Sequence, residues 1–334
     1  ANYLQVKDKL TEKDAAVEFI LYFDKDTIGH YGALILRKNY KYPVFVHISE
    51  KEKFESSLSF DSKTSQMVWN PLIPFFNGVE NIFFSPIGAI HKFAIEYLPF
   101  ENSGFIANKY NIYRVSSTSE IVKRDQKQSF NYKKAIIYGG INYDTDNTTL
   151  QEVVDYQATR GNSGNARLAY LKGTLEEAQN INDVFNVKKI KTVFYEGWFA
   201  TEESFKKLSG SDNGIIHLGT HGFCKVTDSD LRLAVTGGNA QVDGDYAMYN
   251  SGLFFAGANN TLRGDNNSEL EDGVLTSKEV SVLDFSKTDL ITLSACVTGD
   301  GDITGEGVFG VQRGFKLAGA NALVMSCWAV SDAS

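Results

Sequence analysis

The sequence is poor in cysteine, lacks a long apolar run and has no dense cluster of basic residues. Its three cysteines, Cys224, Cys296 and Cys327, are an odd number in 334 residues, which argues against a disulfide framework and predicts a reducing, cytoplasmic compartment. No stretch reaches the roughly 18 apolar residues that a membrane-spanning helix needs, and the N-terminus has no short apolar signal core. We therefore expect no membrane partner.

The charge balance also excludes a class of partner. The net charge is −8, from 33 Lys and Arg against 41 Asp and Glu, and the basic residues are scattered, so direct binding of nucleic acid is not expected. Hydrophobic residues make up 43% of the chain, enough for a sizeable core in one large or two smaller domains. A neutral or basic protein or peptide fits this composition as a partner.

Residues 1–132 have the pattern of a β-rich half. Short segments rich in β-branched and aromatic residues are separated by charged or Asn- and Gly-bearing breaks, which is typical of strands. The expected strands are AAVEFILYF, YGALILRK, YPVFVHIS, ENIFFSPIG, KFAIEYLPF and YNIYRVSS.

Residues 133–334 are predicted to be an α/β half. Strand-like AIIYGGI, TVFYEG, GIIHLGTHG, DLITLSAC and ALVMSCWAV alternate with helical LEEAQNINDVF, TEESFKKL, TSKEVSVLD and GEGVFGVQRGFKLAG. This alternation predicts a mainly parallel sheet flanked by helices. The boundary between the halves is expected at 126–134, a mobile polar insertion at 142–167, and a long functional loop, with the strand SGLFFAG, at 237–272.

Cys296 is the candidate nucleophile. It ends the apolar run LITLSA and precedes a Gly-rich turn, so we expect it at the carboxyl end of a buried strand, the edge where open parallel sheets bind ligands. A thiol needs a neighbouring base to become a thiolate, and the N-terminus of the following helix adds a favourable dipole. A buried structural cysteine is the alternative, and it is the commoner state.

His221 takes the equivalent place on another strand, because GIIHLGT is apolar and a turn is expected to begin at His221-Gly222. An imidazole, whose ordinary pKa is about 6.5, can take the thiol proton and later give it to the leaving amine. The amides of Gly222 and Cys296 form a candidate oxyanion hole. A hydrogen-bonded histidine at a sheet edge is the alternative.

A zinc site is the competing interpretation of His217 and His221, which have the H-x-x-x-H spacing of a helical zinc pair. The flanking residues are strand-like, however, and four residues along a strand separate two side chains by about 13 Å, too far for one zinc ion. We therefore predict no metal and no cofactor, and interpret His217 as a core histidine.

The Gly-rich run at residues 299–307, GDGDITGEG, is a candidate binding loop for a phosphate or a calcium ion. It has no Lys, and Asp300, Asp302 and Glu306 would repel a phosphate. As a calcium loop it matches only the early positions, because Val311 stands where a Glu is required. A mobile active-site loop is the better prediction.

The last apolar run, ALVMSCWAV, supplies the candidate substrate pocket. Trp328 and Asp332 end it, where a loop can line a pocket, with core packing and simple solvation as their alternatives. Cys224 and Cys327 are interpreted as packing residues. The overall negative charge and Asp332 favour a basic side chain before the scissile bond, whereas an apolar pocket around Trp328 would favour an apolar one.

Six segments of the second half occur in one characteristic order: HLGTHGF, SGLFFAG, DGVLTSKEV, DLITLSACVTGDG, GEGVFGVQRGFKLAGA and LVMSCWAVSD. In this order they resemble the CHAT domain, a caspase-like peptidase domain often joined to TPR repeats. Upstream segments, among them DAAVEFI and YNIYRVSS, are also similar to the family, so the resemblance covers nearly the whole chain. FFSPIG carries Ile where relatives usually have Asp, and the chain ends at SDAS where relatives continue.

The resemblance implies a caspase-like catalytic half at residues 133–334, preceded by an inactive, separase-like pseudo-caspase half at residues 1–132. It implies an endopeptidase with a Cys/His dyad and no metal, in which the family's His-Gly pair falls on His221 and its SAC-x-TG block on Cys296. Members of the family act in bacterial defence, with type III-E CRISPR effectors and bacterial gasdermins as known contexts. The expected partners are a protein substrate and an upstream sensor, TPR region or processed C-terminal segment.

Three functions remain open at this point. The first is a regulated endopeptidase, which predicts an acyl-enzyme on Cys296. The second is an idle caspase-like scaffold that binds a partner protein, against which the intact His221 and Cys296 argue. The third is a hydrolase of small amides or esters, which would need an enclosed pocket where this sequence predicts long, open loops.

Overall fold

A computed structural model gives the structure of the chain. It describes residues 1–100, 104–123, 133–144, 167–224, 246–264, 271–297 and 305–325. The chain divides into two compact units, residues 1–128 and 129–334, and each unit has its own sheet and its own apolar core. None of the helices in the described ranges has both the length and the apolar character that crossing a bilayer requires.

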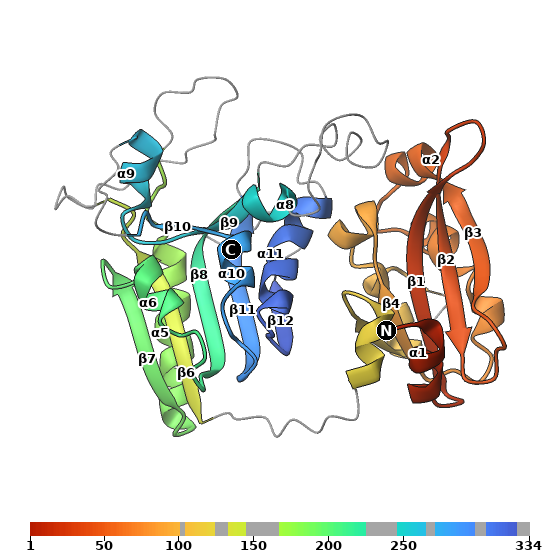
Figure 1. Cartoon of the computed structure of the whole chain (residues 1–334), viewed down its shortest axis with the longest axis horizontal. Helices are drawn as coiled ribbons and strands as arrows, with labels where there is room; N and C mark the ends of the chain where they lie inside the picture. Colours follow the sequence, from red (N-terminus) through yellow and green to blue (C-terminus); the bar gives the residue numbers. More distant parts are fainter. Residues whose placement is uncertain are drawn as a thin grey trace. The chain divides into compact units, whose positions relative to one another are not determined.

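The first unit is built on a mixed five-stranded sheet with the order β3-β2-β1-β4-β5 (Figure 1). The strands are β1 (Asp14–Phe23), β2 (Gly29–Arg37), β3 (Val44–Glu50), β4 (Asn81–Ser85) and β5 (Asn111–Arg114). The first three are antiparallel neighbours, whereas β4 and β5 run parallel to β1. Ala15, Val17 and Phe19 alternate along β1 into the main core of this unit, as the period of two in a strand requires.

Helical segments complete the first unit. They are α1 (Tyr3–Lys9), α2 (Lys51–Ser56), α3 (Ser62–Trp69) and α4 (Ile106–Lys109), with 3-10 helices at Ile73–Phe75, Gly88–Lys92, Ile95–Tyr97 and Thr118–Lys123. The expected strand KFAIEYLPF is wrong. Ile95 and Leu98 are both fully buried, and their spacing of three residues suits a helical turn, not the alternation of a strand. The carbonyl of Ile95 accepts from Nε1 of the buried Trp69 at 2.9 Å, which fixes this turn on α3.

The second unit contains a seven-stranded sheet in which β7, β6, β8, β11 and β12 are parallel neighbours in that order (Figure 1). These strands are β6 (Lys134–Ile141), β7 (Lys191–Gly197), β8 (Gly214–Cys224), β11 (Thr288–Val297) and β12 (Ala322–Met325). Two short strands, β9 (Ser251–Phe254) and β10 (Val274–Thr276), are antiparallel. The prediction of an α/β fold with a mainly parallel sheet is confirmed.

Strand β8 changes its partner along its length. β6 pairs with it over 215–218, β9 pairs with it over 222–224, and β11 stays in register along the other edge over 215–222. The expectation that a turn begins at His221-Gly222 is therefore wrong. The antiparallel β9 supplies new ladder partners at this point, so β8 continues beyond it.

Helices cover both faces of this sheet. They are α5 (Lys172–Val187), α6 (Glu202–Lys206), α8 (Tyr246–Tyr249), α9 (Ala258–Arg263), α10 (Ser277–Ser281) and α11 (Gly305–Leu317). A Cβ at Gly219 of β8 would lie 3.0 Å from the Cβ of Thr174 on α5, so glycine permits this close packing. Its neighbour Leu218, which alternates to the opposite face, shares a core with Phe205 of α6 and Phe315 of α11. The four expected helices are confirmed as α5, α6, α10 and α11, whereas α8 and α9 form within the segment 237–272, where a loop with one strand was expected.

Candidate active site

The candidate site lies at the carboxyl-terminal edge of the parallel strands in the second unit. β8 and β11 are adjacent, and their register pairs His221 with Cys296. Because neighbouring strands are about 4.8 Å apart, the two positions lie side by side in the sheet. The sequence predicts each strand end separately, and the register of the two strands brings them together.

The backbone of His221 is held where β8 changes partner. Its N–H donates to the hydroxyl of Tyr143 at 3.2 Å, and this hydroxyl lies 2.9 Å from that of Thr220. Thr220 donates in turn to the carbonyl of Phe254 on β9. Since a carbonyl only accepts, each hydroxyl in this chain accepts from one neighbour and donates to the next. Tyr143 thus supplies an acceptor between the end of the β6 pairing and the start of the β9 pairing.

The imidazole of His221 is held by a backbone carbonyl. Its Nε2 lies 2.8 Å from the carbonyl oxygen of Ala169, which cannot donate, so Nε2 carries the proton of the neutral ring. Nδ1 then carries the lone pair and is the ring atom that can accept a proton. The ring packs against Tyr143, with centroids 5.0 Å apart. One tautomer of His221 is therefore favoured.

Charged groups surround the adjoining end of β6. Asp144, the residue after Tyr143, pairs with Arg167 at 3.0 Å and with Arg263 at 3.2 Å, and its carbonyl accepts from Nε1 of Trp198 at 3.0 Å. Both arginines are largely exposed, so each pair contributes at most about 1 kcal/mol. These contacts matter for the arrangement of the chain, because through them Asp144 connects residue 167 to α9 and to the end of β7.

His217 lies on the same strand as His221, four residues earlier. It is 4% exposed, and its Nδ1 lies 2.8 Å from the hydroxyl of Thr292, its register partner on β11. Burial lowers the pKa of His217, and the carboxylate of Glu177, 3.8 Å from Nε2, opposes this effect. The prediction of a core histidine is confirmed, and the strand conformation of β8 excludes the helical zinc geometry for this pair.

The remaining predicted positions have different outcomes. Gly222 lies inside β8 and pairs with strands on both edges, so its contribution to an oxyanion hole with Cys296 stays a prediction. Cys224 is the last residue of β8. Other predicted positions lie outside the described residues: Cys327, Trp328, Asp332 and the loop residues 299–304.

Among the described residues, one group of side chains has a spacing suited to a metal ion: Glu202, Glu271 and Glu279. The ammonium of Lys206 lies among them, with N–O distances of 2.7, 2.8 and 3.0 Å to the three carboxylates in that order. Burial raises the pKa of Glu202 to about 7, although the hydrogen bond from Lys206 lowers it. A lysine supplies the positive charge here, and the cluster joins α6 to residues 271–279.

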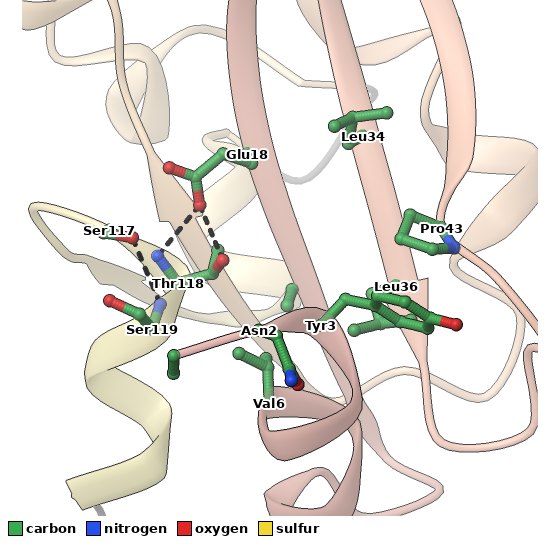
Figure 2. A pocket seen from close by; sticks show the side chains of 12 residues that line it. Asn2, Tyr3, Val6, Glu18, Leu34, Leu36, Pro43, Ser117, Thr118 and Ser119 are labelled. Carbon is green, nitrogen blue, oxygen red and sulfur yellow. Dashed lines mark hydrogen bonds between the residues drawn. The ribbon is translucent and has the colours of Figure 1, made fainter.

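A hollow of about 250 Å³ lies in the first unit beside α1 (Figure 2). Its wall includes Glu18 of β1, whose Oε2 accepts from the backbone N–H and the hydroxyl of Thr118 at 2.9 and 2.6 Å. Neither Cys nor His is among its lining residues. The hollow therefore lacks both residue types of the candidate dyad in the second unit.

Sequence reasoning misses two groups that hold His221. Tyr143 has a usable signal, because the apolar run AIIYGGI ends just before it and the residues after a parallel strand fall on the ligand-binding edge. Ala169 has none, since it contributes only a backbone carbonyl. Its place next to His221 depends entirely on tertiary structure.

Comparison with known families gives one match. A family model for the CHAT domain matches residues 62–334, a range that includes β8, β11 and the paired His221 and Cys296. A comparison with curated proteins finds none that matches. The match agrees with the resemblance carried by the six ordered segments of the sequence.

Proposed function

Since the chain belongs to the CHAT domain family, which is caspase-like and protease-related, we propose that it is a cysteine endopeptidase acting on a partner protein. Cys296 is the proposed nucleophile and His221 its proton-transfer partner. The observation that carries the proposal is the register that pairs these two residues on parallel strands. The carbonyl of Ala169 on Nε2 of His221 supports it, because it leaves the basic lone pair on Nδ1.

Acylation is the first proposed step. Nδ1 of His221 takes the proton of the Cys296 thiol, and the thiolate attacks the scissile carbonyl carbon, so that a C–S bond forms and the carbonyl becomes an oxyanion. Collapse of this intermediate breaks the C–N bond. The leaving amine takes the proton back from Nδ1, and the acyl group remains on Cys296 as a thioester.

Hydrolysis of the thioester completes the cycle. Water loses a proton to Nδ1 of His221 and attacks the thioester carbon, so that a C–O bond forms. Collapse of this intermediate breaks the C–S bond, the sulfur of Cys296 takes the proton from Nδ1, and the carboxylic acid is released. During both steps the imidazolium carries protons on both nitrogens. The carbonyl of Ala169 accepts a hydrogen bond from the N–H of Nε2 in both steps and holds the ring in place.

The proposed setting is a regulated one. A sensor or TPR region upstream would release the protease onto its partner protein in a bacterial defence or cell-death system, as the family resemblance implies. A basic residue before the scissile bond suits the net charge of −8. Amides of Gly222 and Cys296 are the proposed donors to the oxyanion.

Covalent labelling tests this proposal. The chain is incubated with biotinylated peptide chloromethylketones that carry Arg, Lys, Leu, Met or Asp next to the warhead, and intact mass is measured. One adduct is expected on the wild-type chain and none on Cys296→Ala. His221→Ala should slow labelling by roughly 100- to 10,000-fold.

Two matched controls come from the other cysteines. Cys224→Ala and Cys327→Ala should keep the adduct, because neither is the proposed nucleophile. An adduct that persists in Cys296→Ala would overturn the assignment of the nucleophile. Absence of an adduct with every peptide would favour the second candidate, an idle caspase-like scaffold that binds a partner protein.

A further inference from the structure

Asn259 of α9 holds the chain segment that faces His221. Its Oδ1 accepts from the N–H of Leu168 at 2.7 Å, and its Nδ2 donates to the carbonyl of Leu168 at 3.1 Å. One side chain thus satisfies both backbone groups of a single residue, as a neighbouring strand would. The next carbonyl along the chain belongs to Ala169, and it accepts from Nε2 of His221 at 2.8 Å.

The end of β6 fixes Asn259 in its turn. The backbone N–H of Asn259 donates to the carbonyl of Tyr143 at 2.9 Å, and that of Gly257 donates to the carbonyl of Asn142 at 3.3 Å. Gly257 has a φ of 86°, in the left-handed region that glycine adopts without a steric penalty. Because Asn259 is also completely buried, its side chain has little freedom to leave Leu168.

These contacts close a ring around His221. Tyr143 accepts from the backbone N–H of His221 through its hydroxyl and from the backbone N–H of Asn259 through its carbonyl. Asn259 holds Leu168, and the adjacent Ala169 accepts from the imidazole. His221 is therefore anchored at its backbone and at its ring by one connected set of hydrogen bonds.

We infer that Asn259 is a positioning residue that keeps the proton of the His221 imidazole on Nε2 by fixing the carbonyl of Ala169. The two groups of Leu168 require one donor and one acceptor on a short side chain. Asparagine offers both, whereas an ionised aspartate offers no donor and leucine offers neither. Where reaction rates are concerned the inference rests on the proposed function, but the tautomer of His221 does not depend on it.

The test of the tautomer is spectroscopic. The full chain is labelled with ¹⁵N-histidine, and long-range ¹H–¹⁵N spectra are recorded at a pH where histidine is neutral. The chain has five histidines, and His221→Gln assigns the signals of His221. The wild-type chain should show the Nε2–H tautomer, and Asn259→Leu should increase the Nδ1–H population of His221 by at least about tenfold, since a 1.4 kcal/mol difference in hydrogen bonding corresponds to tenfold.

Two further variants keep the test decisive. Asn259→Asp has nearly the same shape and retains an acceptor for the N–H of Leu168, so it serves if Asn259→Leu does not fold, and it should shift the tautomer in the same direction. Asn260→Asp makes the same change one residue along α9 and should leave the spectrum of His221 unchanged. A folded Asn259 variant that keeps the wild-type tautomer would overturn the inference, even if its melting temperature falls.

Kinetics separate this inference from the proposed function. With a peptide substrate found by labelling, Asn259→Leu should lower kcat by about 10- to 100-fold and leave KM nearly unchanged, because a misplaced base affects chemistry more than binding. A shift of the tautomer in a chain that forms no adduct would support the positioning of His221 and contradict the peptidase. An adduct-forming chain whose kcat and tautomer are insensitive to Asn259 would contradict the positioning alone.

Discussion

At the residue scale, Tyr143 links the backbone of His221 to strand β9 through its hydroxyl. The hydroxyl accepts from the N–H of His221 and lies beside Thr220, whose own proton goes to Phe254. The position of His221 along β8 therefore depends on a group that has no place in the chemistry.

The substitution Tyr143→Phe removes this hydroxyl and leaves the ring. We expect the free energy of unfolding to fall by about 1–2 kcal/mol, because the N–H of His221 loses its acceptor. We also expect slower labelling of Cys296 by a chloromethylketone. Thermal unfolding and the rate of adduct formation measure the two effects.

The matched control is Tyr138→Phe, on the strand β6 that precedes Tyr143. Tyr138 is buried, and its hydroxyl lies 3.2 Å from that of Ser204, far along the strand from the candidate site. This variant should lose similar stability and label Cys296 at the wild-type rate. Equal slowing in both variants would mean that Tyr143 acts only through general stability.

At the element scale, the short helix α6 is tied to the sheet by a buried carboxylate. Glu202 is 1% exposed, and its Oε2 accepts from the N–H of Gly273 at 2.9 Å. Burial on its own would lower the pKa of Lys206, but its hydrogen bonds to Glu202, Glu271 and Glu279 outweigh burial and raise it. The ammonium of Lys206, at the centre of the three carboxylates, therefore stays protonated throughout the physiological pH range.

Glu202 makes the stability of this unit depend on pH. Burial raises its pKa from 4.5 in the unfolded chain to about 7, so the folded chain holds a proton that the unfolded chain has lost. The stabilising contribution of this proton is complete below the unfolded pKa and is lost as pH rises through the folded pKa. Glu202→Gln, neutral at every pH, should lack this dependence.

The expected result is that the melting temperatures of the wild-type and Glu202→Gln chains diverge as pH rises. Near pH 5 the wild-type and Glu202→Gln chains should have similar melting temperatures, and above about pH 8 the variant should melt higher, because only the wild-type chain then buries a charge. Differential scanning calorimetry across this range measures the difference. A melting difference that does not change with pH would contradict the raised pKa of Glu202.

The success of sequence reasoning also differs between elements. Strands such as β1 and β8 are predictable because their apolar residues alternate or run continuously between turn residues. The segment around Ile95 has an equally apolar composition and forms a helical turn, because its burial is set by contact with Trp69. Composition alone cannot distinguish these two outcomes.

The candidate site shows the same division. Cys296 and His221 are identifiable because each closes an apolar run in the sequence and carries a reactive side chain, although β8 continues past His221 to Cys224. Tyr143 has a weaker signal, and Asn259 lies in α9, within the segment 237–272 that the sequence predicts only as a long functional loop. The carbonyl of Ala169 has none, since a backbone group next to a distant imidazole leaves no trace in the residue types.

At the scale of the whole molecule, the two units have separate cores. Trp69 is fully buried in the core of the first unit, and Phe315 is fully buried in the core of the second. Each core is closed by strands and helices of its own unit. Damage to one core should therefore leave the other folded.

Trp69→Ala tests this independence. The substitution should destabilise the first unit by about 3–5 kcal/mol through lost burial and the cavity it leaves. Hydrogen exchange should increase over β1 to β5, whereas β6, β8 and β11 stay protected and Cys296 still labels. Phe315→Ala is the reciprocal variant, and it should increase hydrogen exchange in the second unit alone. Loss of protection in both units of either variant would contradict separate folding.

The ring around His221 has a consequence for the order of events during synthesis. Its contacts join residues that are 52, 78 and 91 positions apart, and each closure costs chain entropy before its hydrogen bond forms. His221 leaves the ribosome well before Asn259 and Cys296. Until Asn259 has been synthesised, the hydrogen bonds that position the imidazole cannot all form. In a nascent or half-folded second unit the proposed dyad is consequently not assembled, and the proposed peptidase activity would appear only when the entire unit has been synthesised and folded.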